Sequence, residues 1–246
     1  MSRPEFTIDG RSIPFREGQT IMEAALQAGV YIPHLCYHPL LTPHGSCRLC
    51  ILETGGKIIT ACTTPATPGM DVKNDTEMLN QKRRFLLQLL FTEGNHCCPS
   101  CEKSGHCELQ AMGYWLKMLD TPLPHQFPRR DLDASHPDVL LDRDRCIFCE
   151  RCVRAGRELD GKTIFSLSGR DGHTRLTVNA VSGRLGDTDL KVSDYAVRLC
   201  PTGALLVRGE GFRTPIGARL FDRQDIATFG LKRAISLPGG EKQDEK

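Results

Sequence analysis

The segment Cys146-Ile147-Phe148-Cys149-Glu150-Arg151-Cys152 places three cysteines within seven residues. Further along the chain, residues 199–205 read Leu-Cys-Pro-Thr-Gly-Ala-Leu and add Cys200 directly before a proline. A C-x2-C-x2-C run combined with a Cys-Pro element is the ligand pattern of a ferredoxin-type 4Fe–4S cluster. Three cysteines so close together favour this compact cluster over a zinc ion. We therefore expect a 4Fe–4S cluster on Cys146, Cys149, Cys152 and Cys200.

The same pattern shows what this segment has lost. In a ferredoxin with two clusters, a fourth cysteine follows the run after three residues and binds the second cluster. Here that position is Gly156, and the segment around Cys200 has no C-x2-C-x2-C run of its own. The sequence therefore predicts one cluster in this region rather than two.

A second cysteine group precedes the first along the chain. Cys98, Cys101 and Cys107 provide three ligands, and a four-iron cluster needs a fourth. His96 is the first choice, because imidazole can replace a thiolate on iron. Cys97 competes, although its side chain would have to turn back beside Cys98, and His106 is a weaker rival. We expect a 4Fe–4S cluster on His96, Cys98, Cys101 and Cys107, with Cys97 as a bystander.

A third group lies nearest the N-terminus: Cys36, Cys47, Cys50 and Cys62. Its spacing is wider than the plant-type C-x4-C-x2-C pattern of two-iron ferredoxins but follows the same logic. The turn Gly45-Ser46-Cys47 lets backbone N–H groups approach the sulfurs. Zinc is the alternative, but zinc sites usually present two close cysteine pairs, and this group has one. The nearby residues His34, His38 and His44 suggest Rieske-type ligation, but four cysteines already complete the set. We expect a 2Fe–2S cluster here.

Composition narrows the class of protein. The chain has 246 residues, twelve cysteines and a net charge of +2 with both signs interspersed. Such a balance does not favour binding to nucleic acid or an anionic membrane surface. No apolar run is long enough to span a membrane, and the first residues, MSRPEFTIDG, contain no apolar h-region, so we expect a cytoplasmic protein. A disulfide scaffold would be typical of a short secreted domain, which this chain does not resemble.

Local patterns predict an α+β chain of small modules. Residues 1–76 read as a β-grasp ferredoxin unit, with hairpins at Asp9-Gly10 and Gly55-Gly56 around a helix that begins at Thr20 and stops at Gly29. Residues 77–119 form a helical cluster module, and a proline-rich connector follows at 120–137. The ferredoxin-type module covers 138–208 with a hairpin inserted at 163–178. Residues 209–246 form a docking arm and tail, disordered from Pro238 to Lys246.

Two helices are expected in the helical module. Residues 75–91 carry an apolar stripe and stop at Gly94, and a second helix runs from about Cys107 to Leu119. The members of the stripe are Met78, Leu79, Phe85, Leu86, Leu89 and Leu90.

These motifs, in this order, resemble a known family. The sequence from the two-iron group through EGNHCCPSCEKSGHCELQ (93–110) to CIFCERC and CPTGAL resembles the N-terminal part of the large iron–sulfur subunit of respiratory complex I. It also resembles the iron–sulfur regions of soluble formate dehydrogenases and iron-only hydrogenases. In complex I the cluster histidine lies four positions before the first cysteine, where this chain has Gly94. The form EGNHxC, with His96, is similar to the gamma subunits of soluble NAD-reducing nickel–iron hydrogenases, whose length this chain also shares.

The resemblance implies a function and partners. It implies an electron-relay subunit, itself without a catalytic site, within an NAD-reducing hydrogenase. Its partners would be a flavin-bearing, NAD-binding alpha subunit and the small and large nickel–iron hydrogenase subunits. Two alternatives remain at this point. One is a relay subunit of an NAD-linked formate dehydrogenase or a split complex I, and the other is a zinc-stapled scaffold without redox function.

Overall fold

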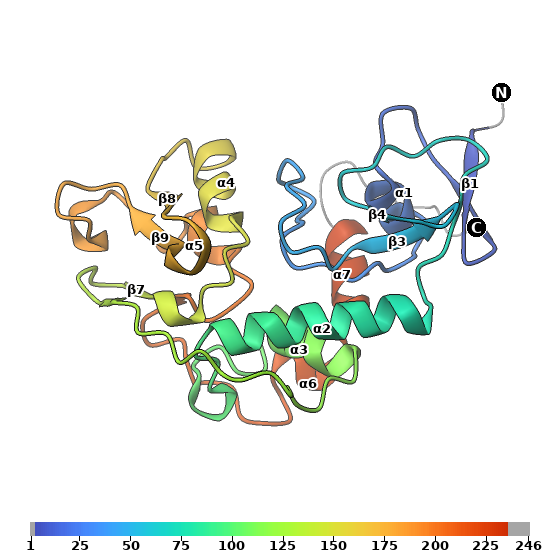
Figure 1. Ribbon diagram of the computed structural model, residues 1–246. Coiled ribbons are helices and arrows are strands. Elements are labelled where there is room, and N and C mark those ends of the chain that lie inside the picture. Colours follow the sequence, from blue (N-terminus) through green and yellow to red (C-terminus); the bar gives the residue numbers. More distant parts are fainter. Residues whose placement is uncertain (1–2, 236–246) are drawn as a thin grey trace. The chain divides into compact units, whose positions relative to one another are not determined.

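The computed structural model describes residues 3–235 and divides them into two compact units (Figure 1). Unit 1 holds residues 3–86, 115–117 and 224–235, and unit 2 holds residues 87–114 and 118–223. Small sheets and short helices occur in both, so the chain is of the α+β class, as expected. Among the described residues, no helix has both the length and the apolar character needed to cross a membrane.

Unit 1 begins with the predicted hairpin. Strands β1 (Glu5–Ile8) and β2 (Arg11–Pro14) pair antiparallel around Asp9 and Gly10. Both turn residues have positive φ, 48° and 79°, which suits a tight two-residue hairpin turn. Strand β5 (Asp71–Val72) joins the other edge of β1 in parallel. A second predicted hairpin, β3 (Ile51–Thr54) and β4 (Lys57–Thr60), turns at Gly55-Gly56.

Helix α1 (Ile21–Gln27) has the predicted capping box. The Thr20 hydroxyl accepts a hydrogen bond from the Glu23 N–H, and the Glu23 carboxylate accepts one from the Thr20 N–H at 2.8 Å. Helix α7 (Ile226–Ile235) packs against α1, as Figure 1 shows, and belongs to unit 1. No periodic pattern in the sequence predicts α7, and Pro238–Lys246, expected to be disordered, lie outside the described residues.

Helix α2 (Glu77–Glu93) confirms the predicted helix but corrects its buried face. Met78, Phe85 and Leu89, assigned to the apolar stripe, are exposed. Leu79, also assigned to the stripe, is fully buried as predicted, but the next buried positions are Arg83 and Leu87, which follow it at intervals of four residues. Helix α3 (Glu108–Trp115) is shorter than the range predicted for it, and the chain turns at Lys117, where φ is 54°.

Unit 2 contains a three-stranded antiparallel sheet in the order β10-β7-β6. Its strands are β6 (Leu132–Asp133), β7 (Val139–Asp142) and β10 (Leu205–Val207). Because β6 lies within the proline-rich segment 120–137, that segment is not only a connector: its end pairs with the sheet.

The remaining elements of unit 2 surround a second core. The inserted hairpin is confirmed as β8 (Phe165–Ser168) and β9 (Arg175–Val178), beside helices α4 (Arg151–Glu158) and α5 (Tyr195–Arg198). Their buried side chains form one apolar cluster with Val139, Leu141 and Leu205 of the sheet. Short helical turns complete the unit: Cys98–Ser100, Arg143–Arg145, Asp171–His173, Leu185–Asp187 and α6 (Leu220–Arg223).

Candidate metal centres

None of the twelve cysteines, all of which lie within residues 3–235, forms a disulfide, so the disulfide alternative is wrong. Eleven of them fall into the three groups that the sequence predicts, and the twelfth, Cys97, is exposed. One group lies in unit 1 and the other two lie in unit 2.

The first group converges in unit 1. The backbone N–H groups of Leu35 and Cys36 each point at Cys47 Sγ at 3.4 Å, and the Cys47 N–H points at Cys36 Sγ at 3.5 Å. Cys50 Sγ lies 3.3 Å from Cys62 Sγ. Backbone donors aimed at sulfur are what a cluster needs, because they stabilise the negative charge of thiolate ligands.

The chemistry of these four thiols favours a bound cation. Hydrogen bonds from Cys47 and Cys62 lower the pKa of Cys36 far below the ordinary value for a thiol. Hydrogen bonds with Cys36 and Cys50, together with burial, raise the pKa of Cys62, and a hydrogen bond with Cys36 likewise raises that of Cys47. The hydrogen bond from Cys62 lowers the pKa of Cys50, so negative charge is favoured on Cys36 and Cys50 while Cys47 and Cys62 keep their protons. A metal centre would replace those protons and convert all four to thiolates.

A buried arginine holds the loop around Cys50. Arg83 of α2 is 1% exposed and makes five hydrogen bonds. Its guanidinium donates to the backbone carbonyls of Leu49 (3.1 Å) and Ile51 (2.7 Å), the two neighbours of Cys50. The other bonds go to Asn74 and Asn80, and burial lowers the pKa of Arg83 to about 10. Arg83 was not identified as a functional residue from the sequence. Its position four residues from both Leu79 and Leu87 was a signal that it lies on the same buried face of the helix.

The three histidines near this group hold loop backbone or face solvent. His34 Nδ1 lies 2.7 Å from the Ile32 carbonyl oxygen, and His38 Nδ1 accepts a hydrogen bond from the Leu40 N–H at 3.3 Å. His44 is exposed.

The second group lines a small cavity in unit 2. Its walls include all four predicted ligands, His96, Cys98, Cys101 and Cys107, whereas neither Cys97 nor His106 contributes to them. Burial raises the pKa of Cys107 to about 12, so a thiolate there requires a compensating positive charge.

His96 has the surroundings expected of a metal-binding histidine. Its side chain is partly buried, and its buried Nε2 atom has no hydrogen-bond partner among the described residues. Burial lowers the pKa of His96 to about 4, against the opposite effect of a ring N–H donating to the Leu90 carbonyl, so the imidazole is neutral. Metal-bound histidines typically use one ring nitrogen for such a carbonyl and the other for the metal. The imidazole fits here only because residue 94 is a glycine. A Cβ at Gly94 would collide with His96 Nε2 and lie 2.8 Å from the Asp144 carbonyl oxygen.

The third group lines another cavity of unit 2, and its walls include the four predicted cysteines, Cys146, Cys149, Cys152 and Cys200. The chain curls around this cavity because Phe148 and Glu150 both adopt positive φ, 52° and 56°. The Thr202 hydroxyl donates to the Arg145 carbonyl at 2.9 Å, which ties the Cys-Pro segment to the cysteine run. Burial raises the pKa of Cys146 to about 12.

The structure explains the missing second ferredoxin site. Gly156 lies in α4, and a Cβ there would be 2.8 Å from the Lys162 carbonyl oxygen. The Lys162 N–H in turn donates to the Gly156 carbonyl at 2.7 Å. No cysteine fits at this position without a backbone shift.

The second and third groups are joined by direct contacts within unit 2. Arg145, next to Cys146, points its Nη1 at Cys101 Sγ at 3.5 Å and forms ion pairs with Glu102 (2.6 Å) and Asp142 (2.8 Å). From the Cys200 side, Gly203 approaches so closely that a Cβ would lie 3.0 Å from Cys101 Sγ.

A buried ion pair forms a further connection. Glu108, which follows Cys107, pairs with Arg151, which precedes Cys152, at 2.9 Å. Arg151 is completely buried. The Glu108 N–H also donates to the Pro201 carbonyl at 2.8 Å, next to Cys200. The ligand loops of the two groups therefore form one hydrogen-bonded assembly.

Comparisons with known proteins agree with this arrangement. Three family models match in the order of the sites: a 2Fe–2S iron–sulfur cluster binding domain (residues 3–77), an NADH-ubiquinone oxidoreductase-G iron–sulfur binding region (83–122) and an NADH-quinone oxidoreductase subunit 3 ferredoxin-like domain (136–206).

Whole-chain relatives extend the comparison. The chain is 40% identical to the gamma subunit of the NAD-reducing hydrogenase HoxS of Cupriavidus necator, over 97% of this chain and 99% of that protein. It is 31% identical to the G subunit of the NADH-quinone oxidoreductase of Rickettsia typhi, over 92% of this chain but only 33% of that protein. A chain in a crystal structure of an NAD+-reducing NiFe-hydrogenase in the H2-reduced state superposes with a TM-score of 0.91 and 50% identity, covering 95% of this chain and 99% of that one.

Proposed function

The chain belongs to the family of gamma subunits of NAD-reducing hydrogenases, and from this premise we propose that it relays electrons between the NAD-linked and hydrogen-linked parts of such a complex. It is an electron-transfer subunit of an oxidoreductase and not the site of catalysis. The observation that carries the proposal is the convergence of three separate cysteine groups in a chain that matches a gamma subunit from end to end.

The proposed cofactors are one 2Fe–2S and two 4Fe–4S clusters. The two-iron cluster would be held by Cys36, Cys47, Cys50 and Cys62, in a unit that we assign as a β-grasp ferredoxin fold. The four-iron clusters would be held by His96, Cys98, Cys101 and Cys107, and by Cys146, Cys149, Cys152 and Cys200. Such clusters accept and donate single electrons, with potentials set by ligand charge, hydrogen bonds and burial.

The fourth ligand of the second site is proposed to be His96. Its unpartnered, buried and neutral Nε2 supports the assignment, as does the exposure of Cys97. A neutral imidazole in place of a thiolate makes this cluster less negative than its four-cysteine neighbour, and a less negative cluster is easier to reduce.

The contacts between the second and third sites support a direct path between them. Arg145 and Gly203 both come from the ligand loops of the third site and both approach Cys101 Sγ of the second. The buried Glu108–Arg151 pair fixes the two loops in one arrangement. These residues hold the two sites at a constant separation. An electron relay needs this, because the rate of electron transfer depends on the distance between the clusters.

The partners follow from the family. We propose a flavin-bearing, NAD-binding alpha subunit on one side and the small and large nickel–iron hydrogenase subunits on the other, with H2 + NAD+ ⇌ NADH + H+ as the overall reaction, in the cytoplasm. A complex I assignment is less well supported, because the chain spans only about a third of the Rickettsia oxidoreductase protein and nearly all of the Cupriavidus gamma protein.

The test is reconstitution of the whole complex. With this chain present, the complex should reduce NAD+ with H2, and the alpha subunit alone should still pass electrons from NADH to an artificial acceptor. Co-purification with a formate-oxidising molybdenum subunit, and formate-dependent NAD+ reduction, would contradict the hydrogenase assignment.

A further inference from the structure

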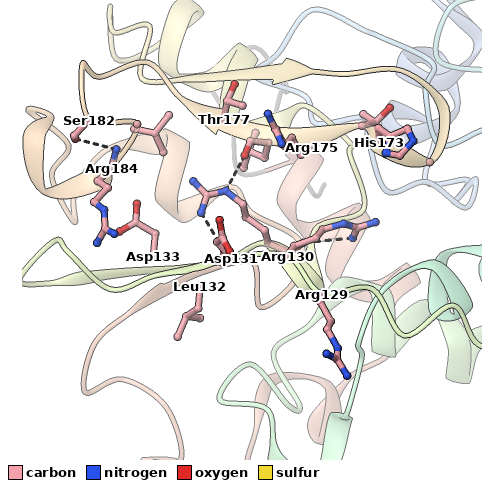
Figure 2. Close-up of a pocket in the computed structure, with 16 residues that line it drawn as sticks. Arg129, Arg130, Asp131, Leu132, Asp133, His173, Arg175, Thr177, Ser182 and Arg184 are labelled. Carbon is pink, nitrogen blue, oxygen red and sulfur yellow. Dashed lines mark hydrogen bonds between the residues drawn. The ribbon is translucent and has the colours of Figure 1, made fainter.

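A cleft of unit 2 lies beside the third site and is used by none of the proposed ligands. It measures about 880 Å³, is open to solvent, and is lined by 16 residues from the 129–133 segment, the short helix before Cys146, and the 172–184 region (Figure 2). Two segments that are distant in the sequence, 129–133 and 172–184, thus form its two walls.

The cleft is strongly basic. Its lining carries two aspartates and five arginines, Arg129, Arg130, Arg143, Arg175 and Arg184. The surplus of three positive charges exceeds the net charge of the entire chain, which is +2. Asp133 is buried, and its carboxylate accepts hydrogen bonds from Ser135 and from the Leu185 N–H.

The five arginines differ in the contacts that their guanidinium groups make within the unit. Arg143 forms the floor, donating to the carbonyls of Leu176 (2.9 Å) and Asp131 (3.0 Å). Arg130 lies over the Phe148 ring at 5.0 Å. Their positions are therefore fixed from within the unit.

Three arginines remain for a ligand. Arg129, Arg175 and Arg184 are exposed, and their guanidinium groups form no hydrogen bond or ion pair with any residue in the range 3–235. Figure 2 shows Arg129 on the 129–133 side of the cleft, with its side chain directed away from Arg175 on the opposite wall, and Arg184 at one end. Free guanidinium groups on both walls of an open groove suit an anionic partner that lies along it, because each can bind a carboxylate with two parallel hydrogen bonds.

The chemistry of the lining distinguishes between anions. Pockets for small molecules are mostly apolar and enclose their ligand, whereas this cleft is polar and open. Sites for single-stranded nucleic acid interleave basic and aromatic residues, and the lining contains no Phe, Tyr or Trp. An acidic polypeptide segment can bind in an open cleft and needs no aromatic side chains to stack on, so it fits this lining better than either of the other two classes of ligand.

The cleft also adjoins the third cluster site. Leu176 lines both the cleft and the cysteine cavity, and Arg130 stacks on Phe148, which lies between Cys146 and Cys149. We propose that this arginine cleft is a docking surface for an acidic segment of a partner subunit, which it seats beside the third site. The proposal rests on the proposed function, since it requires that the chain work inside a multi-subunit complex.

The test is a charge reversal of the three free arginines, R129E/R175E/R184E, in the full-length, cluster-loaded chain. The matched control, R157E/R198E/R213E, reverses three other exposed arginines of the same unit that form no side-chain hydrogen bond or ion pair within residues 3–235. A conservative variant, R129K/R175K/R184K, keeps the charge. Association with the alpha subunit and with the hydrogenase small–large pair is measured separately, at about 20, 100 and 500 mM NaCl, a range that spans weak to strong screening.

We expect the cleft reversal to slow association with one of these partners by about tenfold or more at the lowest salt, and the difference to shrink as salt screens the charges. The lysine variant and the control triple should stay close to wild type. No change with either partner, an equal change in the control triple, or a defect that salt does not reduce would each overturn the proposal. So would tight binding of inorganic phosphate or ADP by the wild type and not by the reversed triple, with subunit association unaffected.

The same variants distinguish a failure of the proposed electron-relay function from a failure of the proposed docking surface. EPR spectra of the reduced variants should match wild type, since no cluster ligand is changed. Wild-type chain that carries no iron would refute the relay, whereas normal clusters with unaltered association would refute only the docking surface.

Discussion

Replacing Arg83 with methionine should open the two-iron site without touching any of its ligands. Arg83 supplies the donors for the carbonyls of Leu49 and Ile51 on either side of Cys50, and for the backbone carbonyl of Asn74. Methionine keeps most of the volume and removes all five hydrogen bonds, so the consequence is electrostatic rather than a cavity.

The magnitude follows from the acceptors left behind. A buried acceptor without a donor costs about 1–3 kcal/mol. We use the low end of that range, because the variant no longer has to bury a charged guanidinium and this gain offsets part of the loss. Three backbone carbonyls without donors then give a destabilisation of about 3 kcal/mol. This corresponds to a roughly hundredfold increase in the population of the locally opened loop.

Hydrogen exchange of the holo protein, followed by mass spectrometry, measures this opening at the amides of β3 and β4 (51–60). We expect exchange there to accelerate by about a hundredfold, the two-iron EPR signal to weaken, and the four-iron signals to remain. The neighbouring Arg84 provides the control, since its ion pair with Glu77 is at the surface and its replacement by methionine should cost less than about 1 kcal/mol. Unchanged exchange and a full two-iron signal in Arg83→Met would show that this arginine does not hold the loop.

The other predictions concern unit 2. His96→Ala should abolish or shift one four-iron EPR signal and Cys97→Ala should leave all signals intact; the reverse result would transfer the ligand role to Cys97. Gly156→Cys should add no iron and should lower the thermal stability by about 1–3 kcal/mol through steric overlap, so an additional cluster in that variant would show that the lost site can be restored. Glu108→Gln should destabilise unit 2 by about 3 kcal/mol in thermal unfolding and perturb both four-iron signals, because it removes the carboxylate that pairs with the buried Arg151. The double change with Arg151→Met should recover part of that loss, and strict additivity of the two single changes would argue against the pair.

The ligand groups and hairpins could be predicted because they depend on local chain geometry. Cysteines two residues apart can reach one centre wherever the segment lies, and Asp9-Gly10 forms its turn with little help from the rest of the chain. The absence of a second ferredoxin site was equally local, since it required only reading Gly156 in place of a cysteine.

Features that depend on tertiary contact were not predictable in the same way. Arg83 occupies a core position because acceptors from two separate segments, 49–51 and Asn74, surround it. Helix α7 includes Gly230, a poor helix former, but a Cβ there would lie 2.7 Å from the ring of Tyr31, so close packing within unit 1 requires the glycine. The arginine cleft arises from segments that are separate in the sequence, where each arginine alone is an ordinary surface residue.

Metal analysis combined with low-temperature EPR decides whether three iron–sulfur clusters occupy this chain. The anaerobically purified protein should contain about ten iron and about ten sulfide per chain, and its reduced form should show one two-iron and two four-iron signals. Stoichiometric zinc without iron or sulfide would contradict the relay function and would leave the cysteine groups as structural metal sites.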